Sequence, residues 1–177
     1  MALLTTLQEV DVRLFGRIFG HGHRWRAARW IAKVISRSGD GYLQVLLPLL
    51  FIALDTVNAD QYVNVLVAAM AIERLLYVIL KNKLKRRRPQ DYMPGFRSVI
   101  NASDKFSFPS GHSSAAFCLA TATSLILGGP FIALYLWACF VALSRVVLGV
   151  HFPGDTLAGA ALGSGVAIAT AHYLQMV

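Results

Sequence analysis

The sequence of 177 residues is poor in acidic side chains, in cysteine and in charge overall. It has nine Asp and Glu against 17 Lys and Arg, and charged residues make up 15% of the chain, compared with about 25% in an average soluble domain. Its two cysteines, Cys118 and Cys139, both lie inside apolar runs, so we expect buried thiols and no disulfide framework. These shortages exclude a disordered chain and argue against an ordinary water-soluble enzyme.

Motifs for metal binding and for secretion are also missing. The few acidic residues form no HExxH and no paired-Asp motif, so no metal site is expected. The first residues do not look like a secretory signal, because no basic segment precedes them and Glu9 and Asp11 come early.

Apolar residues are abundant, at 56% of the chain with a mean hydropathy of +0.55. A helix that crosses a bilayer needs ~20 mostly apolar residues. Five segments come close to this, at 42–57, 62–80, 113–127, 131–149 and 156–177. The sequence therefore predicts an all-α, polytopic membrane bundle of about five transmembrane helices. In the last segment, Gly159 and Gly163 offer a small-residue face for close helix packing.

Residues 1–38 differ from the core at 39–177 by mixing apolar and basic residues. Leu3, Leu7 and Leu14 recur at helical spacing, and Trp25 and Trp30 lie among seven Lys and Arg residues. This pattern predicts N-terminal amphipathic helices in the headgroup layer, with a globular cap on the bundle as the alternative.

The basic residues are distributed unevenly over the five predicted spans. All of the 17 Lys and Arg except Arg74 fall at or near one end of the bundle. The positive-inside rule then predicts a multi-pass cell-membrane protein with this end in the cytoplasm, although a phosphate site would also concentrate basic residues there. Inside the second span, Glu73 and Arg74 are expected to pair with polar groups of the bundle.

A first cluster of candidate residues is the basic run from Lys81 to Pro89, KNKLKRRRP. Such a run can contact anionic lipid headgroups. No nucleic-acid partner is expected, because the run emerges directly from an apolar span.

A second cluster runs from Phe108 to His112, just before an apolar helix. Ser110 is a good N-cap, and the free N–H groups of a helix start can bind an anion. The alternative is a capped helix start with an incidental histidine.

A third cluster comprises Ser144, Arg145, His151 and Asp155. An arginine at the end of a span is costly and usually functional, and a carboxylate four residues after a histidine can orient its ring. A snorkelling arginine beside an interfacial His–Asp pair is the alternative.

Together the three clusters resemble the type-2 phosphatidic acid phosphatase family, which shares its active site with vanadium haloperoxidases. The family pattern is K-x6-R-P, then P-S-G-H, then S-R-x5-H-x3-D. All of its spacings occur here, from Lys81 through His112 to Asp155, and the resemblance covers about residues 40–177.

The resemblance implies a role for each matching residue. His151 would be the nucleophile that forms a phosphohistidine, oriented by Asp155, and His112 would be the general acid and then the base. The phosphoryl oxygens would be held by Lys81, Arg88, Ser110, Gly111 and Arg145, with Gly111 leaving room for the anion. Neither a metal nor another cofactor is implied.

The predicted function is therefore that of an integral membrane lipid phosphatase. Its substrate would be phosphatidic acid, phosphatidylglycerophosphate, or a polyprenyl phosphate or diphosphate, and its only other expected partner is the bilayer. The long 91–108 segment could line the substrate entrance or form a surface loop. A lipid phosphotransferase that uses an alcohol acceptor is the main alternative, and a non-catalytic basic scaffold would not explain the spacings. A haloperoxidase is disfavoured because the related peroxidases are soluble.

Overall fold

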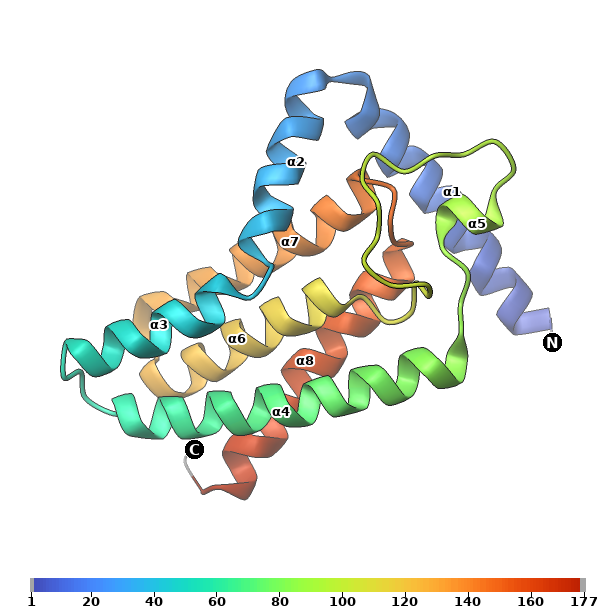
Figure 1. Ribbon diagram of the computed structural model, residues 1–177. Coiled ribbons are helices and arrows are strands. Elements are labelled where there is room, and N and C mark those ends of the chain that lie inside the picture. Colours follow the sequence, from blue (N-terminus) through green and yellow to red (C-terminus); the bar gives the residue numbers. More distant parts are fainter. Residues whose placement is uncertain (1, 176–177) are drawn as a thin grey trace.

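The computed structural model describes residues 2–175, and each regular element in that range is a helix (Figure 1). In chain order these are α1 (Ala2–Arg24), α2 (Arg26–Ser38), α3 (Tyr42–Ala53), α4 (Ala59–Leu84), α5 (Pro89–Tyr92), α6 (Gly111–Leu127), the 3-10 helix η1 (Gly129–Ala133), α7 (Leu134–Val147) and α8 (Pro153–Tyr173). Met1, which belongs to the predicted N-terminal region, and Met176 and Val177, which end the predicted last span, lie outside the described residues.

Each of the five apolar segments contains a helix, in the order α3, α4, α6, η1 with α7, and α8. Among the described residues, the stretches Ala59–Tyr92 and Gly129–Val147 are long and apolar enough to cross a membrane, whereas α3 and α6 are shorter apolar helices. The count of five spans therefore stays a prediction. The tight turn between α6 and η1 is made by Gly128, at a φ of 62° that favours glycine.

Helix α6 is the centre of the bundle, because it packs against α4, α7 and α8. Its closest neighbour is α8, where Gly159 and Gly163 face the α6 backbone. A Cβ atom at Gly163 would overlap the carbonyl oxygen of Ser114, and one at Gly159 would overlap that of Ser110. The predicted small-residue face is thus confirmed as the contact that lets α6 and α8 approach each other closely.

Large apolar side chains cover much of the outside of the bundle. On α3 and α4, Leu46, Leu49, Val67 and Leu75 are each more than half exposed. Contiguous apolar surface of this kind is unusual for a soluble monomer and is typical of contact with lipid.

The expectation of two buried cysteines is only half right. Cys118 is buried in the core between α4, α6 and α8, but Cys139 is exposed on α7. Both residues lie in equally apolar sequence, so hydropathy could not distinguish the inner from the outer face of these helices.

The two N-terminal helices lie over the loop end of the bundle and form a V in Figure 1. They meet at Trp25, whose backbone is extended. Phe15 of α1 packs against Phe152, and α2 lies along α7. Trp25 and Trp30 remain exposed, at 71% and 67%.

The α6–α8 contact generates a stability prediction. Gly163→Ala should lower the free energy of unfolding by about 1–3 kcal/mol, because the added methyl group meets a backbone oxygen that cannot move without shifting α6. Thermal unfolding in detergent measures this. Gly165→Ala is the matched control on the same helix, because nothing lies within 4 Å of its Cβ position, and it should not be destabilised. Equal unfolding temperatures for the two variants would contradict the close packing.

Candidate active site

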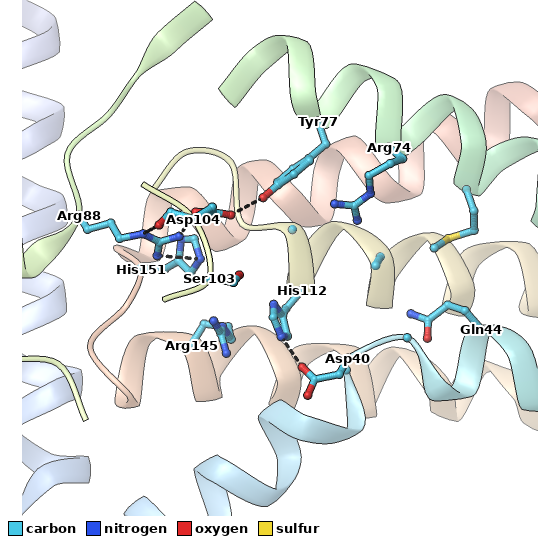
Figure 2. Close-up of a pocket in the computed structure, with 15 residues that line it drawn as sticks. Asp40, Gln44, Arg74, Tyr77, Arg88, Ser103, Asp104, His112, Arg145 and His151 are labelled. Atoms are coloured by element: carbon cyan, nitrogen blue, oxygen red, sulfur yellow. Dashed lines mark hydrogen bonds and ion pairs between the residues drawn. The ribbon is translucent and has the colours of Figure 1, made fainter. Parts of the chain in front are cut away.

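The three sequence motifs converge on one cavity of about 350 Å³ at the loop end of the bundle (Figure 2). Of the predicted site residues, five line it: Arg88, Gly111, His112, Arg145 and His151. The other three, Lys81, Ser110 and Asp155, are buried next to residues that line it. Side chains from the end of α4, the start of α6, the end of α7 and the turn before α8 therefore share one site.

His151 lies in the turn that joins α7 to α8, so its ring is set by that turn and not by a helix. Its Nδ1 lies 3.6 Å from Asp155 Oδ2, which is ion-pair distance but long for a hydrogen bond. Asp155 itself accepts the N–H of Phe152 at 2.8 Å and the guanidinium of Arg86 at 2.7 Å. The predicted His–Asp proximity is present, and the same carboxylate also caps α8.

The electrostatics of His151 favour a neutral ring. Burial lowers its pKa from 6.5 to about 4, and the nearby Asp155 only partly opposes this. Its Nε2 lies 3.4 Å from Arg88 Nη1, on the cavity side (Figure 2). A neutral imidazole with Nε2 next to an anion-binding group is the form that can act as a nucleophile.

Two of the predicted phosphate-binding cations, Lys81 and Arg88, form ion pairs with Asp104, a carboxylate outside the sequence motifs. Asp104 accepts Lys81 Nζ at 2.8 Å and Tyr77 Oη at 2.7 Å through Oδ2, and it pairs with Arg88 through Oδ1. Arg88 also donates to the carbonyl of Val150 at 2.6 Å.

Burial alone would raise the pKa of Asp104, but the hydrogen bonds from Lys81, Tyr77 and Arg88 outweigh it and hold that pKa well below its usual range. Asp104 is therefore ionised and takes the place of an anion between Lys81 and Arg88. In the sequence, the signal that points to Asp104 is that acidic residues are rare, nine in all, and that this one lies in the loop between two motifs.

Helix α2 and the linker that follows it contribute two further groups, Ser36 and Asp40. His112 Nε2 lies 2.7 Å from Asp40 Oδ1, and Arg145 Nη1 donates to Ser36 Oγ at the end of α2. The Nε of Arg145 is buried without a partner among the described residues. Asp40 and Ser36 lie outside the sequence motifs, so no spacing rule pointed to them.

At the start of α6, Ser110 is the N-cap as predicted, because its Oγ accepts the N–H of Ser113 at 3.4 Å. Gly111 lines the cavity next to this cap, and its role in leaving room for an anion stays a prediction. A Cβ atom at this position would meet the ring of Tyr77 at 3.0–3.2 Å, so the missing side chain makes room for Tyr77. Within residues 2–175 no group of three or more His, Cys, Asp or Glu side chains is placed to hold a metal ion.

A basic residue of the first cluster, Arg86, has a role that the family pattern did not assign. It bridges Asp155, at 2.7 Å, and Asp11 of α1, at 2.6 Å. Asp11 in turn accepts the N–H of Gly154 at 2.7 Å. The carboxylate behind His151 is therefore held by an arginine that the N-terminal helix itself anchors.

The sequence is similar to known lipid phosphatases. The profile of the PAP2 superfamily matches residues 62–177. The chain is 39% identical over 102 residues to phosphatidylglycerophosphatase B of Bacillus subtilis (strain 168), and the aligned stretch covers 51% of this chain and 47% of that protein. It is 35% identical over 101 residues to lipid A 1-phosphatase of Rhizobium johnstonii, and the aligned stretch covers 55% of this chain and 41% of that protein. The chain spans about half the length of the curated relatives it matches.

The fold is also similar to solved structures. The crystal structure of Aquifex aeolicus LpxE matches with a TM-score of 0.80 at 26% identity, over 93% of this chain and 96% of that one. A transmembrane PAP2-type phosphatidylglycerolphosphate phosphatase from Bacillus subtilis matches with a TM-score of 0.77 at 24% identity, over 97% of this chain and 88% of that one. At this lower identity the second likeness shows the fold alone.

The buried position of His151 generates a pH prediction. Its imidazole should stay neutral as the pH falls from 7 to about 5 and should take up a proton only near pH 4, because burial penalises the charged ring. An unfolded histidine binds its proton near pH 6.5, so this site stabilises the fold fully above that pH and progressively less as the pH falls towards 4. Histidine-selective NMR titration in detergent measures the ring, with His151→Gln to assign its signal. Titration near 6.5 would contradict the buried geometry.

Proposed function

Because residues 62–177 match its profile, the chain belongs to the PAP2 superfamily, and we propose that it is a multi-pass membrane phosphatase that removes the terminal phosphate of a lipid. The observation that carries this proposal is that two histidines from separate motifs, His112 and His151, line one cavity together with Arg88 and Arg145. The curated relatives with matching sequence are named as lipid phosphatases. The cytoplasmic orientation of the site stays a prediction.

In the proposed reaction, Nε2 of neutral His151 attacks the phosphorus atom, and the bond from phosphorus to the lipid oxygen breaks. His112 gives a proton to the departing oxygen, which is otherwise a poor leaving group. Burial and the nearby Arg145 lower the pKa of His112, and the Asp40 carboxylate, 2.7 Å from Nε2, opposes this shift and so supports the protonated form that this role needs. The product of this step is a phosphohistidine and the free lipid alcohol.

In the second step, His112 takes a proton from water, and the water oxygen attacks the phosphohistidine. Inorganic phosphate leaves and His151 returns to its neutral form. Across both steps the phosphoryl oxygens carry redistributed negative charge, which Arg88, Lys81 and Arg145 would stabilise without reorganising. Asp155 would balance the charge that His151 acquires as it bonds to phosphorus.

Substrate binding must displace Asp104, because its carboxylate occupies the donors of Lys81 and Arg88 that a phosphate would need. Its side chain is 35% exposed and belongs to the loop between α5 and α6, so it can swing towards solvent. This exchange replaces one anion by another and keeps the buried cations compensated throughout.

His151→Ala should abolish phosphate release from phosphatidic acid or phosphatidylglycerophosphate in detergent, because it removes the imidazole that accepts the phosphoryl group in the proposed reaction. His112→Ala should lower the rate by about 10²–10⁴-fold on these lipids, but much less for the first step on p-nitrophenyl phosphate, whose leaving group needs no proton. Burst kinetics of nitrophenol and phosphate separate the two steps.

The matched control is His172→Ala, which removes an exposed imidazole from the other end of α8 and should leave turnover unchanged. Turnover that persists in His151→Ala would refute the nucleophile assignment. Chromatography of the lipid products in the presence of an added alcohol distinguishes hydrolysis from phosphotransfer.

Asp104→Asn should bind inorganic phosphate about tenfold more tightly. The substitution removes the ionised carboxylate that competes for Lys81 and Arg88, and a charge-assisted hydrogen bond of this kind contributes roughly 1.5 kcal/mol. The inhibition constant of orthophosphate in the lipid assay measures this effect. Asp91→Asn, an exposed acidic residue on α5 outside the cavity, is the control for lost charge. Weaker phosphate binding by Asp104→Asn would mean that the carboxylate organises the cations and does not compete with phosphate.

A further inference from the structure

The cavity extends beyond the groups that the proposed reaction uses. Arg88 and His151 line one end, whereas Gln44 of α3 and Met70 and Arg74 of α4 line the other. In Figure 2 the side chains of Arg74 and Gln44 both point into the cavity from the side opposite Arg88. A lone phosphate held by Arg88 and Lys81 would leave this end unfilled.

Arg74 is an unusual residue for its position. It lies in the middle of the apolar helix α4, where a cation is costly and usually functional. Its guanidinium lies over the ring of Tyr77, 4.4 Å from the ring centroid, and its Nη2 is 3.5 Å from Glu73 Oε2. The side chain is still 50% exposed, so these two contacts leave guanidinium donors available to a ligand.

Gln44 supplies a second, independent observation. Both its Nε2 and its Oε1 are buried, and neither has a hydrogen-bond partner among the described residues. Buried amide groups are almost always paired, because leaving them unpaired costs free energy. An orphaned amide that lines the same cavity as Arg74 indicates a polar ligand at this end, and the cation favours an anionic one.

We propose that Arg74 and Gln44 form a subsite for a second phosphoryl group of the substrate, one joined to the scissile phosphate through a short polyol such as glycerol. This inference rests on the proposed function and specifies its substrate. Arg74 would hold the phosphodiester oxygens in its planar fork, and the Gln44 amide would donate to the same group or to a linker hydroxyl. The acyl chains beyond the phosphodiester would lie along the exposed apolar side chains of α3 and α4.

Tyr77 contacts both cations. The centroid of its ring lies 4.4 Å from the Arg74 guanidinium carbon and 4.5 Å from Lys81 Nζ, so the two charged groups lie around one ring. Two phosphates joined by a three-carbon linker can therefore contact both cations at once. The diphosphate arm of the test separates this linker from a directly bridged pair.

The test compares Arg74→Gln with the unaltered protein on three substrates in the same detergent. These are phosphatidylglycerophosphate, phosphatidic acid and a polyprenyl diphosphate, with released phosphate as the readout. Arg74→Gln should lower kcat/KM on phosphatidylglycerophosphate by about tenfold or more, because one charge-assisted contact is lost. On phosphatidic acid, which has no second phosphate, the change should stay below about twofold. Gln44→Leu should show the same selective loss to a smaller degree.

Lys83→Gln is the matched control, because it removes one exposed positive charge from the same helix outside the cavity and should affect all three substrates equally and weakly. Unchanged vanadate inhibition of Arg74→Gln shows that the phosphate site and the fold are intact. Equal losses on all substrates, no loss on phosphatidylglycerophosphate, or a loss confined to the diphosphate would each overturn the subsite. An unaltered protein that releases phosphate from none of the three would instead refute the proposed function, and the subsite with it.

Discussion

Buried positive charge at one end of an apolar bundle is the constraint on which the rest of the structure depends. Lys81, Arg88 and Arg145 are each at most 6% exposed and share one small region. Cations removed from water need compensation, and here Asp104 pairs with two of them while Ser36 accepts from the third. Compensation by a partly exposed loop residue, and not by a fully buried one, leaves the charge available to an external anion. The pairing with Asp104 that stabilises these cations is thus also the one that the proposed substrate would exchange with.

The helices around this charge cluster are positioned by two kinds of contact. Small residues bring α8 against α6, and this approach lets the N–H of Ser110 donate to the carbonyl of Asp155 at 2.9 Å. The start of α6 and the start of α8 are thereby fixed to each other. Polar contacts then join the N-terminal helices to the same end, because Arg86 bridges Asp155 and Asp11. The N-terminal region, whose sequence predicts a position at the membrane surface, is therefore linked through Arg86 to the carboxylate that lies beside the proposed nucleophile.

Two residues show what local sequence leaves open. Cys139 and Cys118 have similar neighbours in sequence, yet one faces outward and the other faces the core. Gly111 lies in a motif that binds anions by resemblance, and its missing side chain also accommodates Tyr77, which is 34 residues earlier in the chain. In both cases local sequence identifies a helix or a helix start correctly. The packing of several helices decides which neighbour fills the adjacent space, and the hydropathy of the sequence does not encode that packing.

The sequence by itself determined the helical class, the position of the apolar helices, the Ser110 cap, the glycine face of α8 and the motif residues that line the cavity. These features follow from local periodicity, from capping chemistry and from fixed spacings, which act over a few residues. Only the tertiary structure decided that Asp104 occupies the cations and that Asp40 meets His112, 72 residues away. The same holds for the orphaned amide of Gln44, which lines the same cavity as Arg74. Contacts between distant segments obey no spacing rule, because they form only after the helices have packed.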